Sequence, residues 1–237
     1  MPPRDQRLWR YVDLWKFEAL LQASALYFRR ADKLSDVGEG RLSKEGVRGT
    51  LRSQIAFNAA YNIASQSHAI DLAAHEITRG CMFINCWNIA ETERTKMWAE
   101  YTTSEKSIVM STTLDRLLRV VSVNHLLVSR VKYVDEDTPR AEFSHTTPFF
   151  YKDTCFSFEN ELRLVRPLMS GEQVLTNDER DFGKLIHVDV SRLIDRIVMH
   201  KHMPAETRDL VGTLVKTHCP GAELLLSAVE PNRHKTS

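Results

Sequence analysis

An excess of charge of either sign is missing from this sequence. Its 237 residues carry 32 Lys and Arg against 31 Asp and Glu, which gives a formal net charge of +1. A broad nucleic-acid-binding surface usually shows a clear basic excess. The charge balance therefore argues against such a surface, without excluding a local basic patch. Hydrophobic residues make up 43% of the chain and charged residues 27%, so we expect a folded globular protein rather than a disordered one.

Long apolar runs and paired cysteines are also missing. No run approaches the roughly 20 apolar residues that a membrane helix needs, and the polar start at 1–5 lacks the apolar stretch of a signal peptide. The four cysteines, Cys81, Cys86, Cys155 and Cys219, include no pair spaced by two residues. This pattern favours reduced thiols buried as small hydrophobes. We therefore expect a cytoplasmic protein with no membrane partner.

The common motifs for nucleotides, metals and serine nucleophiles are absent as well. The sequence has no phosphate-binding glycine-rich loop, no dinucleotide-binding glycine pattern and no Gly-x-Ser-x-Gly elbow. His200, His202, His218 and Cys219 lie near one another in the sequence, but their spacing is unspecific for a metal site. Surface or edge histidines are the favoured interpretation, and we expect no metal.

What the sequence does contain is an irregular succession of strand and helix patterns. Their spacing lacks a regular β–α–β repeat, which indicates an α+β fold. We predict a single α+β domain over 1–230 with a mixed, twisted central sheet, a helical insert at about 47–79, and a flexible tail at 231–237. Strands are predicted at 8–12, 25–28, 81–87, 107–112, 161–166, 185–190, 196–199 and 222–227, and the segment 120–134 is predicted to hold two strands or one bent hairpin. Helices are predicted after Asp13 and at 91–101, 114–118 and 204–217. The expected core contains Phe83, Trp87, Met97, Ile108, Val109, Leu162, Leu164, Ile197 and Leu214.

The best candidate for chemistry is a pair of glutamates, Glu159 and Glu161, that leads into a predicted strand. Residues two apart project to the same side of an extended chain. Carboxylates held that close shift each other's pKa, which suits acid–base catalysis. The alternatives are that both side chains are solvated, or that one pairs with Arg163 on the same strand face.

Several blocks, in order and spacing, resemble a known bacterial family. They are 8–11, 26–28, 36–40, 83–87, 97–101, 131–133, Lys152 with 158–163, and the closing unit at 197–227. Together they are similar to a bacterial family catalogued as domain of unknown function number twenty-nine seventy-one. The resemblance spans nearly the whole chain, but the family name supplies no activity.

A second resemblance does imply an activity. Arg10 on the first strand, Ser111-Thr112-Thr113 at the end of a middle strand and Glu159-x-Glu161 before a later strand resemble the arginine–serine–glutamate pattern of mono-ADP-ribosyltransferases. This resemblance implies NAD as a substrate, Arg10, Ser111 and Thr112 in the NAD pocket, and catalysis by Glu161 with Glu159. The pattern differs at Thr113, where that family has serine, and the interval from Arg10 to Ser111 is long.

This resemblance predicts an enzyme of a bacterial toxin or phage-defence type that acts on an acceptor macromolecule of unknown identity. Aromatic side chains such as Tyr27 and Trp98 could stack on the nicotinamide or adenine ring, although such residues more often belong to the core. Arg10 could instead pair with Asp36 or Glu39.

A non-enzymatic module is the alternative. It would recognise a nucleotide or a nucleic acid in a bacterial stress or defence system. Arg10, Arg29, Arg30 and Lys152 are the candidate contacts for phosphate. Binding to nucleic acid is not favoured, because the net charge is close to zero.

Overall fold

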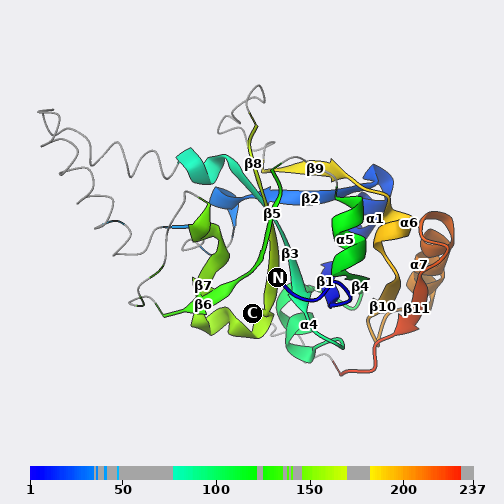
Figure 1. Cartoon of the computed structure of the whole chain (residues 1–237). Helices are drawn as coiled ribbons and strands as arrows, with labels where there is room; N and C mark the ends of the chain where they lie inside the picture. Colours follow the sequence, from blue (N-terminus) through cyan, green and yellow to red (C-terminus); the bar gives the residue numbers. More distant parts are fainter. Residues whose placement is uncertain are drawn as a thin grey trace, which may run out of the picture.

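The computed structural model of the chain describes residues 1–34, 36, 40, 41, 47, 77–121, 125–135, 138, 140, 146–169 and 182–230. These residues form one α+β domain built on a large, mostly antiparallel sheet (Figure 1). The elements are β1 (Arg7–Asp13), α1 (Leu14–Ala23), β2 (Ala25–Arg30), η1 (Ala31–Lys33), β3 (Met82–Ile89), α4 (Thr95–Tyr101), β4 (Ser107–Thr113), α5 (Leu114–Val120), β5 (Leu127–Arg130), β6 (Lys132–Val134), η2 (Thr147–Phe150), β7 (Tyr151–Asp153), η3 (Thr154–Glu159), β8 (Glu161–Pro167), β9 (Gly183–His187), α6 (Val190–Leu193), β10 (Arg196–Met199), α7 (Ala205–His218) and β11 (Glu223–Leu226).

Strand β3 is the centre of the sheet, because it pairs with β1, β2 and β8. The sheet runs in the order β11-β10-β4-β1-β3-β2-β9. Off this path, β8 pairs with β3 on one edge and with β5 on the other. The pairs of the sheet are antiparallel except for β10 and β11, which run parallel on either side of α7. These last three elements form a β–α–β unit at the strand, helix and strand that the sequence predicted for 196–227, although the parallel pairing was not predicted. Strands β6 and β7 form a separate parallel pair.

The two faces of the sheet carry different side chains, because successive residues of a strand point to opposite sides. Helices α1, α5, α6 and α7 gather on one face (Figure 1) and pack with Leu162 and Leu164 into the largest core cluster. The other face carries a cluster around Trp9 and Trp98. Glu161 and Arg163 alternate with the two leucines along β8, so they lie on this second face.

The predicted α+β class and nearly all of the predicted core are confirmed. Eight of the expected core residues are buried, while Leu214 is partly buried: Phe83, Trp87, Met97, Ile108, Val109, Leu162, Leu164 and Ile197. The helical prediction for 91–101 began too early, since α4 begins at Thr95, and Val190 begins a helix rather than ending a strand. The insert at about 47–79 lies almost entirely outside the described residues, and the tail at 231–237 lies wholly outside them.

Asp13 directly precedes α1, as predicted, but its carboxylate forms no capping hydrogen bond with that helix. Its Oδ1 atom accepts hydrogen bonds from the Thr103 amide at 2.8 Å and the Ser107 hydroxyl at 3.0 Å. Asp13 therefore fastens β1 to the turn that leads into β4.

None of the four cysteines forms a disulfide, and they are not uniformly buried. Cys219 is buried, Cys81 and Cys86 are partly buried, and Cys155 is exposed, which departs from the expected role as small core residues. In the part of the chain that the structure describes, no helix is long and apolar enough to cross a bilayer.

Candidate functional site

Glu159 and Glu161 come together at the junction of η3 and β8. Asn160 between them adopts a left-handed conformation with φ 40° and ψ 62°, so the two glutamates do not belong to one extended segment as predicted. Their carboxylates instead converge on Lys152. Its Nζ lies 2.7 Å from Glu159 Oε2 and 4.0 Å from Glu161 Oε2.

Each carboxylate oxygen of the two glutamates has a partner. Arg163 binds Glu161 with two parallel bonds, from Nε to Oε1 at 2.7 Å and from Nη2 to Oε2 at 2.9 Å. Glu159 accepts hydrogen bonds from the Tyr101 hydroxyl and from Lys152. Both glutamates are 4% exposed. The structure thus confirms the alternative in which Glu161 pairs with Arg163. We call these five residues the glutamate cluster.

The surroundings push the two glutamate pKa values in opposite directions. Burial raises the pKa of Glu159, and repulsion from Glu161 adds to this rise, although Lys152 and Tyr101 act against it. Burial would also raise the pKa of Glu161, but the charge and hydrogen bonds of Arg163, helped by Lys152, outweigh burial and lower it. Such divergence assigns different protonation roles to two neighbouring carboxyl groups. The surroundings therefore favour the ionised form of Glu161 and disfavour that of Glu159.

Tyr101 is a hydrogen-bond donor in this cluster. Burial, and then the negative charge of Glu159, raise the pKa of Tyr101 well above its usual value, so its hydroxyl stays protonated. It reaches Glu159 from the last residue of α4. A second tyrosine, Tyr133, accepts a hydrogen bond at 2.8 Å from the backbone amide of Glu161.

Asn88 and two exposed cations border the cluster. Asn88 lies opposite Glu161 in the β3–β8 register and donates its side-chain amide to the Glu159 carbonyl. Its buried Oδ1 atom has no hydrogen-bond partner among the described residues. Arg94 donates to the Phe158 carbonyl at 3.0 Å, and Lys96 Nζ lies 3.7 Å from the centre of the Phe158 ring.

Ser111 shares the face of Glu161 but lies far along the sheet. The register connects Ser111 to Trp9, Trp9 to Asn88, and Asn88 to Glu161, so two strands separate the serine from the glutamate. At about 4.8 Å per strand, their backbones are about 14 Å apart. The Ser111 hydroxyl accepts a hydrogen bond at 2.8 Å from Arg7, which also pairs with Asp195 at 3.0 Å.

Arg10 points to the opposite face. It follows Trp9 in β1, and the row from Trp9 to Glu161 faces the glutamate cluster, so the Arg10 side chain must leave from the other side. Its guanidinium lies over the Trp87 ring, 5.9 Å from the ring centre. Burial lowers the pKa of Arg10. The structure therefore does not bring Arg10 to the two glutamates.

Among the described residues, the other three predicted site residues form no hydrogen bond with the two glutamates. Thr112 donates its hydroxyl to the Leu193 carbonyl on the helix-covered face. Tyr27 is 41% exposed on β2, which pairs with the opposite end of β3 from Asn88. Trp98 is 0% exposed and belongs to the core cluster with Trp9, so it offers no open ring face to a ligand.

The predicted phosphate contacts of a recognition module do not form one patch. Arg30 is buried and pairs with Asp32 at 2.6 Å, whereas Lys152 is buried against the glutamates. Arg29 is exposed on β2, and Arg10 lies beside Trp87. A contiguous basic surface does not arise from these four side chains.

Tyr101 and the role of Lys152 were missed at the sequence level. Neither residue lies at a characteristic spacing from Glu159 or Glu161, because η3 and α4 bring them in by tertiary packing. Arg163 did carry a signal, the alternation of charged and apolar residues at 161–166. Among the described residues, no group of three or more His, Cys, Asp or Glu side chains is arranged to hold a metal ion.

No protein-family model matches the chain, and a search of curated proteins finds no match either. The two resemblances found in the sequence therefore remain predictions.

Proposed function

We propose that the chain is an NAD-using mono-ADP-ribosyltransferase-like enzyme, of a bacterial toxin or phage-defence type, with Glu161 as its transition-state carboxylate. The observation that carries the proposal is the buried glutamate pair on one lysine, with pKa values shifted in opposite directions. A transferase needs one carboxylate that stays ionised and a second group that can accept a proton. Glu161 and Glu159 fit these two roles.

In the proposed reaction, the bond between the ribose C1′ atom and the nicotinamide nitrogen breaks, and its electron pair leaves with neutral nicotinamide. Positive charge then develops on the ribose, as in glycoside cleavage. A fixed Glu161 carboxylate stabilises that charge more in the transition state than in the ground state. The acceptor attacks C1′ and gives its proton to Glu159. Lys152 and Arg163 hold the two carboxylates in place.

The phosphates of NAD need cations on the same face as Glu161. Arg94 and Lys96 are exposed and flank Phe158, the residue before Glu159, and we assign them this role. Arg10, which the family resemblance would use, lies on the opposite face. Because phosphate contacts exist before and during the reaction, Arg94 and Lys96 contribute to NAD affinity more than to turnover.

Glu161→Gln should cut nicotinamide release by about 10²- to 10³-fold, the scale for loss of one electrostatic stabiliser. NAD affinity, measured by calorimetry, should change little, because the charge that Glu161 stabilises appears only during bond cleavage. Mass spectrometry of free nicotinamide and of ADP-ribose added to cell-extract proteins supplies the readout.

Glu100→Gln, a change at an exposed position of α4, is the matched control and should retain full turnover. Glu161→Asp provides a second test if the glutamine variant folds poorly, because it retains the negative charge but moves it away from the ribose. Absence of NAD binding at millimolar concentration would end the transferase proposal.

The pH profile tests Glu159. Its pKa is raised, and it must be ionised to accept a proton, so kcat/KM should fall at low pH with a midpoint above the usual glutamate value of about 4.3. The Tyr101 hydrogen bond lowers the pKa of Glu159, so Tyr101→Phe should move this acidic limb to higher pH. A limb that stays in place in Tyr101→Phe, or persists in Glu159→Gln, would remove Glu159 as the base.

A non-enzymatic nucleotide- or nucleic-acid-recognition module is the second candidate. Charge neutrality within the glutamate cluster favours a protein without turnover. Lys152 and Arg163 neutralise Glu159 and Glu161, and every carboxylate oxygen is already bonded. Such a network can also be purely structural. NAD binding without nicotinamide release would select this candidate. For nucleic acid, retention must weaken steeply as salt rises.

A further inference from the structure

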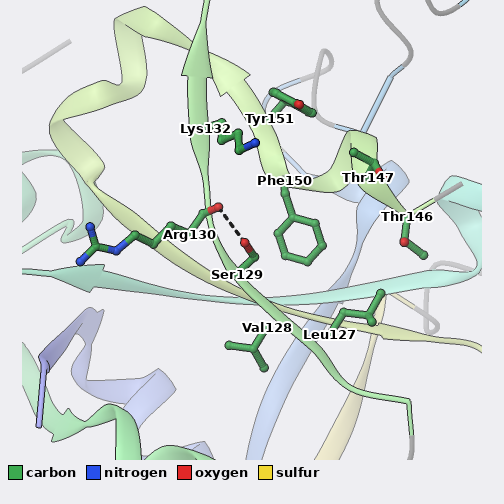
Figure 2. Close-up of a pocket in the computed structure, with 9 residues that line it drawn as sticks. All are labelled: Leu127, Val128, Ser129, Arg130, Lys132, Thr146, Thr147, Phe150 and Tyr151. Carbon is green, nitrogen blue, oxygen red and sulfur yellow. Dashed lines mark hydrogen bonds between the residues drawn. The ribbon is translucent and has the colours of Figure 1, made fainter. Parts of the chain in front are cut away.

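A cavity of about 280 Å³ lies beside β5, on residues outside the glutamate cluster. Its lining includes Leu127, Ser129, Lys132, Thr146, Thr147 and Phe150. Figure 2 shows the Phe150 ring between β5 and the two threonines. The Lys132 ammonium points to the side of β5 on which Phe150 lies. Phe150 and Tyr151, three residues with aliphatic hydroxyl groups and the Lys132 ammonium therefore line a common space.

The charge in this cavity comes from Lys132. The Arg130 guanidinium points away from Phe150 (Figure 2), so Arg130 contributes its backbone and stem. Lys132 is exposed and forms no ion pair with the carboxylates that the structure describes; its Nζ lies 5.8 Å from the centre of the Tyr151 ring. An ammonium in this position can accept an anionic group without first breaking an ion pair.

The hydroxyl groups suit a ligand with both donors and acceptors. Ser129 donates to the Arg130 carbonyl at 3.2 Å, which is long for a bond between a hydroxyl and an oxygen. This hydroxyl can therefore turn to a ligand at little cost. Thr146 and Thr147 lie on the other side of Phe150 from β5 (Figure 2).

We propose that this cavity binds a nucleoside monophosphate group. The base stacks on Phe150, the phosphate lies at Lys132, and the hydroxyls of Ser129 and the threonines contact the sugar and the base edge. The volume lies just below the 300–1,000 Å³ usual for ligand pockets, which limits the occupant to about one mononucleotide. The group can come from a free mononucleotide or from one half of a dinucleotide.

Calorimetry with AMP tests the proposal on the full chain, without NAD or turnover. AMP should bind at micromolar to millimolar concentration, adenosine should bind more weakly, and inorganic phosphate should bind weakest. Lys132→Met should weaken AMP binding by about 10- to 100-fold, the loss of one charge-assisted hydrogen bond. Phe150→Ala should weaken it by about 5- to 100-fold, the loss of base stacking.

Lys216→Met, at an exposed position of α7, is the matched control and should bind AMP like the unaltered chain. Displacement of AMP by NAD identifies a dinucleotide as the source, and its absence identifies a free mononucleotide. No AMP binding at millimolar concentration, or binding that Lys132→Met leaves unchanged, overturns the proposal. Because AMP binding is measured without NAD, failure here leaves the glutamate chemistry untouched, and failure of nicotinamide release leaves this site untouched.

Discussion

Replacing Arg163 with methionine should lower the free energy of unfolding by about 3–5 kcal/mol, the cost of breaking a buried ion pair from one side. The Arg163 side chain is 0% exposed. It supplies both bonds to the Glu161 carboxylate and a third, at 2.7 Å, to the Phe149 carbonyl. Its loss leaves a buried negative charge whose remaining ion pair, among the described residues, is with Lys152 at 4.0 Å. Urea unfolding followed by circular dichroism measures the loss.

The size of this loss should depend on pH. In the unaltered chain the pKa of Glu161 is lowered, so its pairing stabilises the fold above the unfolded value of about 4.3 and less below it. In Arg163→Met, burial raises the pKa of Glu161, so stability falls as pH rises through the unfolded value. The difference between the two proteins should therefore be larger at pH 7 than at pH 4.

Two further variants separate the buried charge from the lost contacts. Arg163→Met with Glu161→Met should recover much of the loss, because a buried pair can be replaced by apolar residues at little cost. Arg196→Met breaks the exposed pair with Glu223 at 2.8 Å and should cost only about 0–1 kcal/mol. A loss below about 1 kcal/mol for Arg163→Met, or one that is equal at both pH values, would contradict the role assigned to Arg163.

The hydrophobic pattern predicted the elements of the sheet well, because alternation is a local property. Leu162 and Leu164 alternate with charged residues and are buried as expected. The same pattern also pointed to Arg163 as a partner of Glu161, since residues two apart share a strand face. Fold class, most strands and one contact of the candidate site therefore followed from the sequence.

Register and turn geometry could not be predicted in the same way. The sequence gives the order of Arg10, Ser111 and Glu161 along the chain. The face of the sheet on which each side chain lies depends on which residues pair across the strands. A shift of one residue in the strand pairing moves a side chain to the opposite face of the sheet. In the observed pairing Trp9, and not Arg10, lies in the same row as Glu161, so Arg10 faces away from the glutamates. The left-handed Asn160 likewise ended the expected extended segment, and only tertiary packing brings Tyr101 to Glu159.

Trp98→Ala should destabilise the chain by about 3–5 kcal/mol, the usual cost of removing a large buried aromatic side chain. The indole is 0% exposed and meets the rings of Tyr11 and His200 edge-on, with centres 5.5 Å and 5.4 Å away. Its Nε1 donates to Glu93 at 2.8 Å. Thermal unfolding measures the loss, and Trp15→Ala, at a position 63% exposed, should change stability by no more than about 0.5 kcal/mol.

The same experiment separates a core role for Trp98 from a ligand-stacking role. Glu93 also accepts hydrogen bonds from the Ser227 hydroxyl and the Ala228 amide, each at 2.7 Å, so Trp98 helps to hold the end of β11 against the turn before α4. Trp98→Phe keeps an aromatic ring but loses the bond to Glu93, and it should cost less than the alanine change. If Trp98 stacked on NAD, the alanine variant would lose NAD affinity while keeping its stability. A buried position predicts the reverse, a large loss of stability and, at temperatures where the variant stays folded, NAD affinity close to that of the unaltered chain.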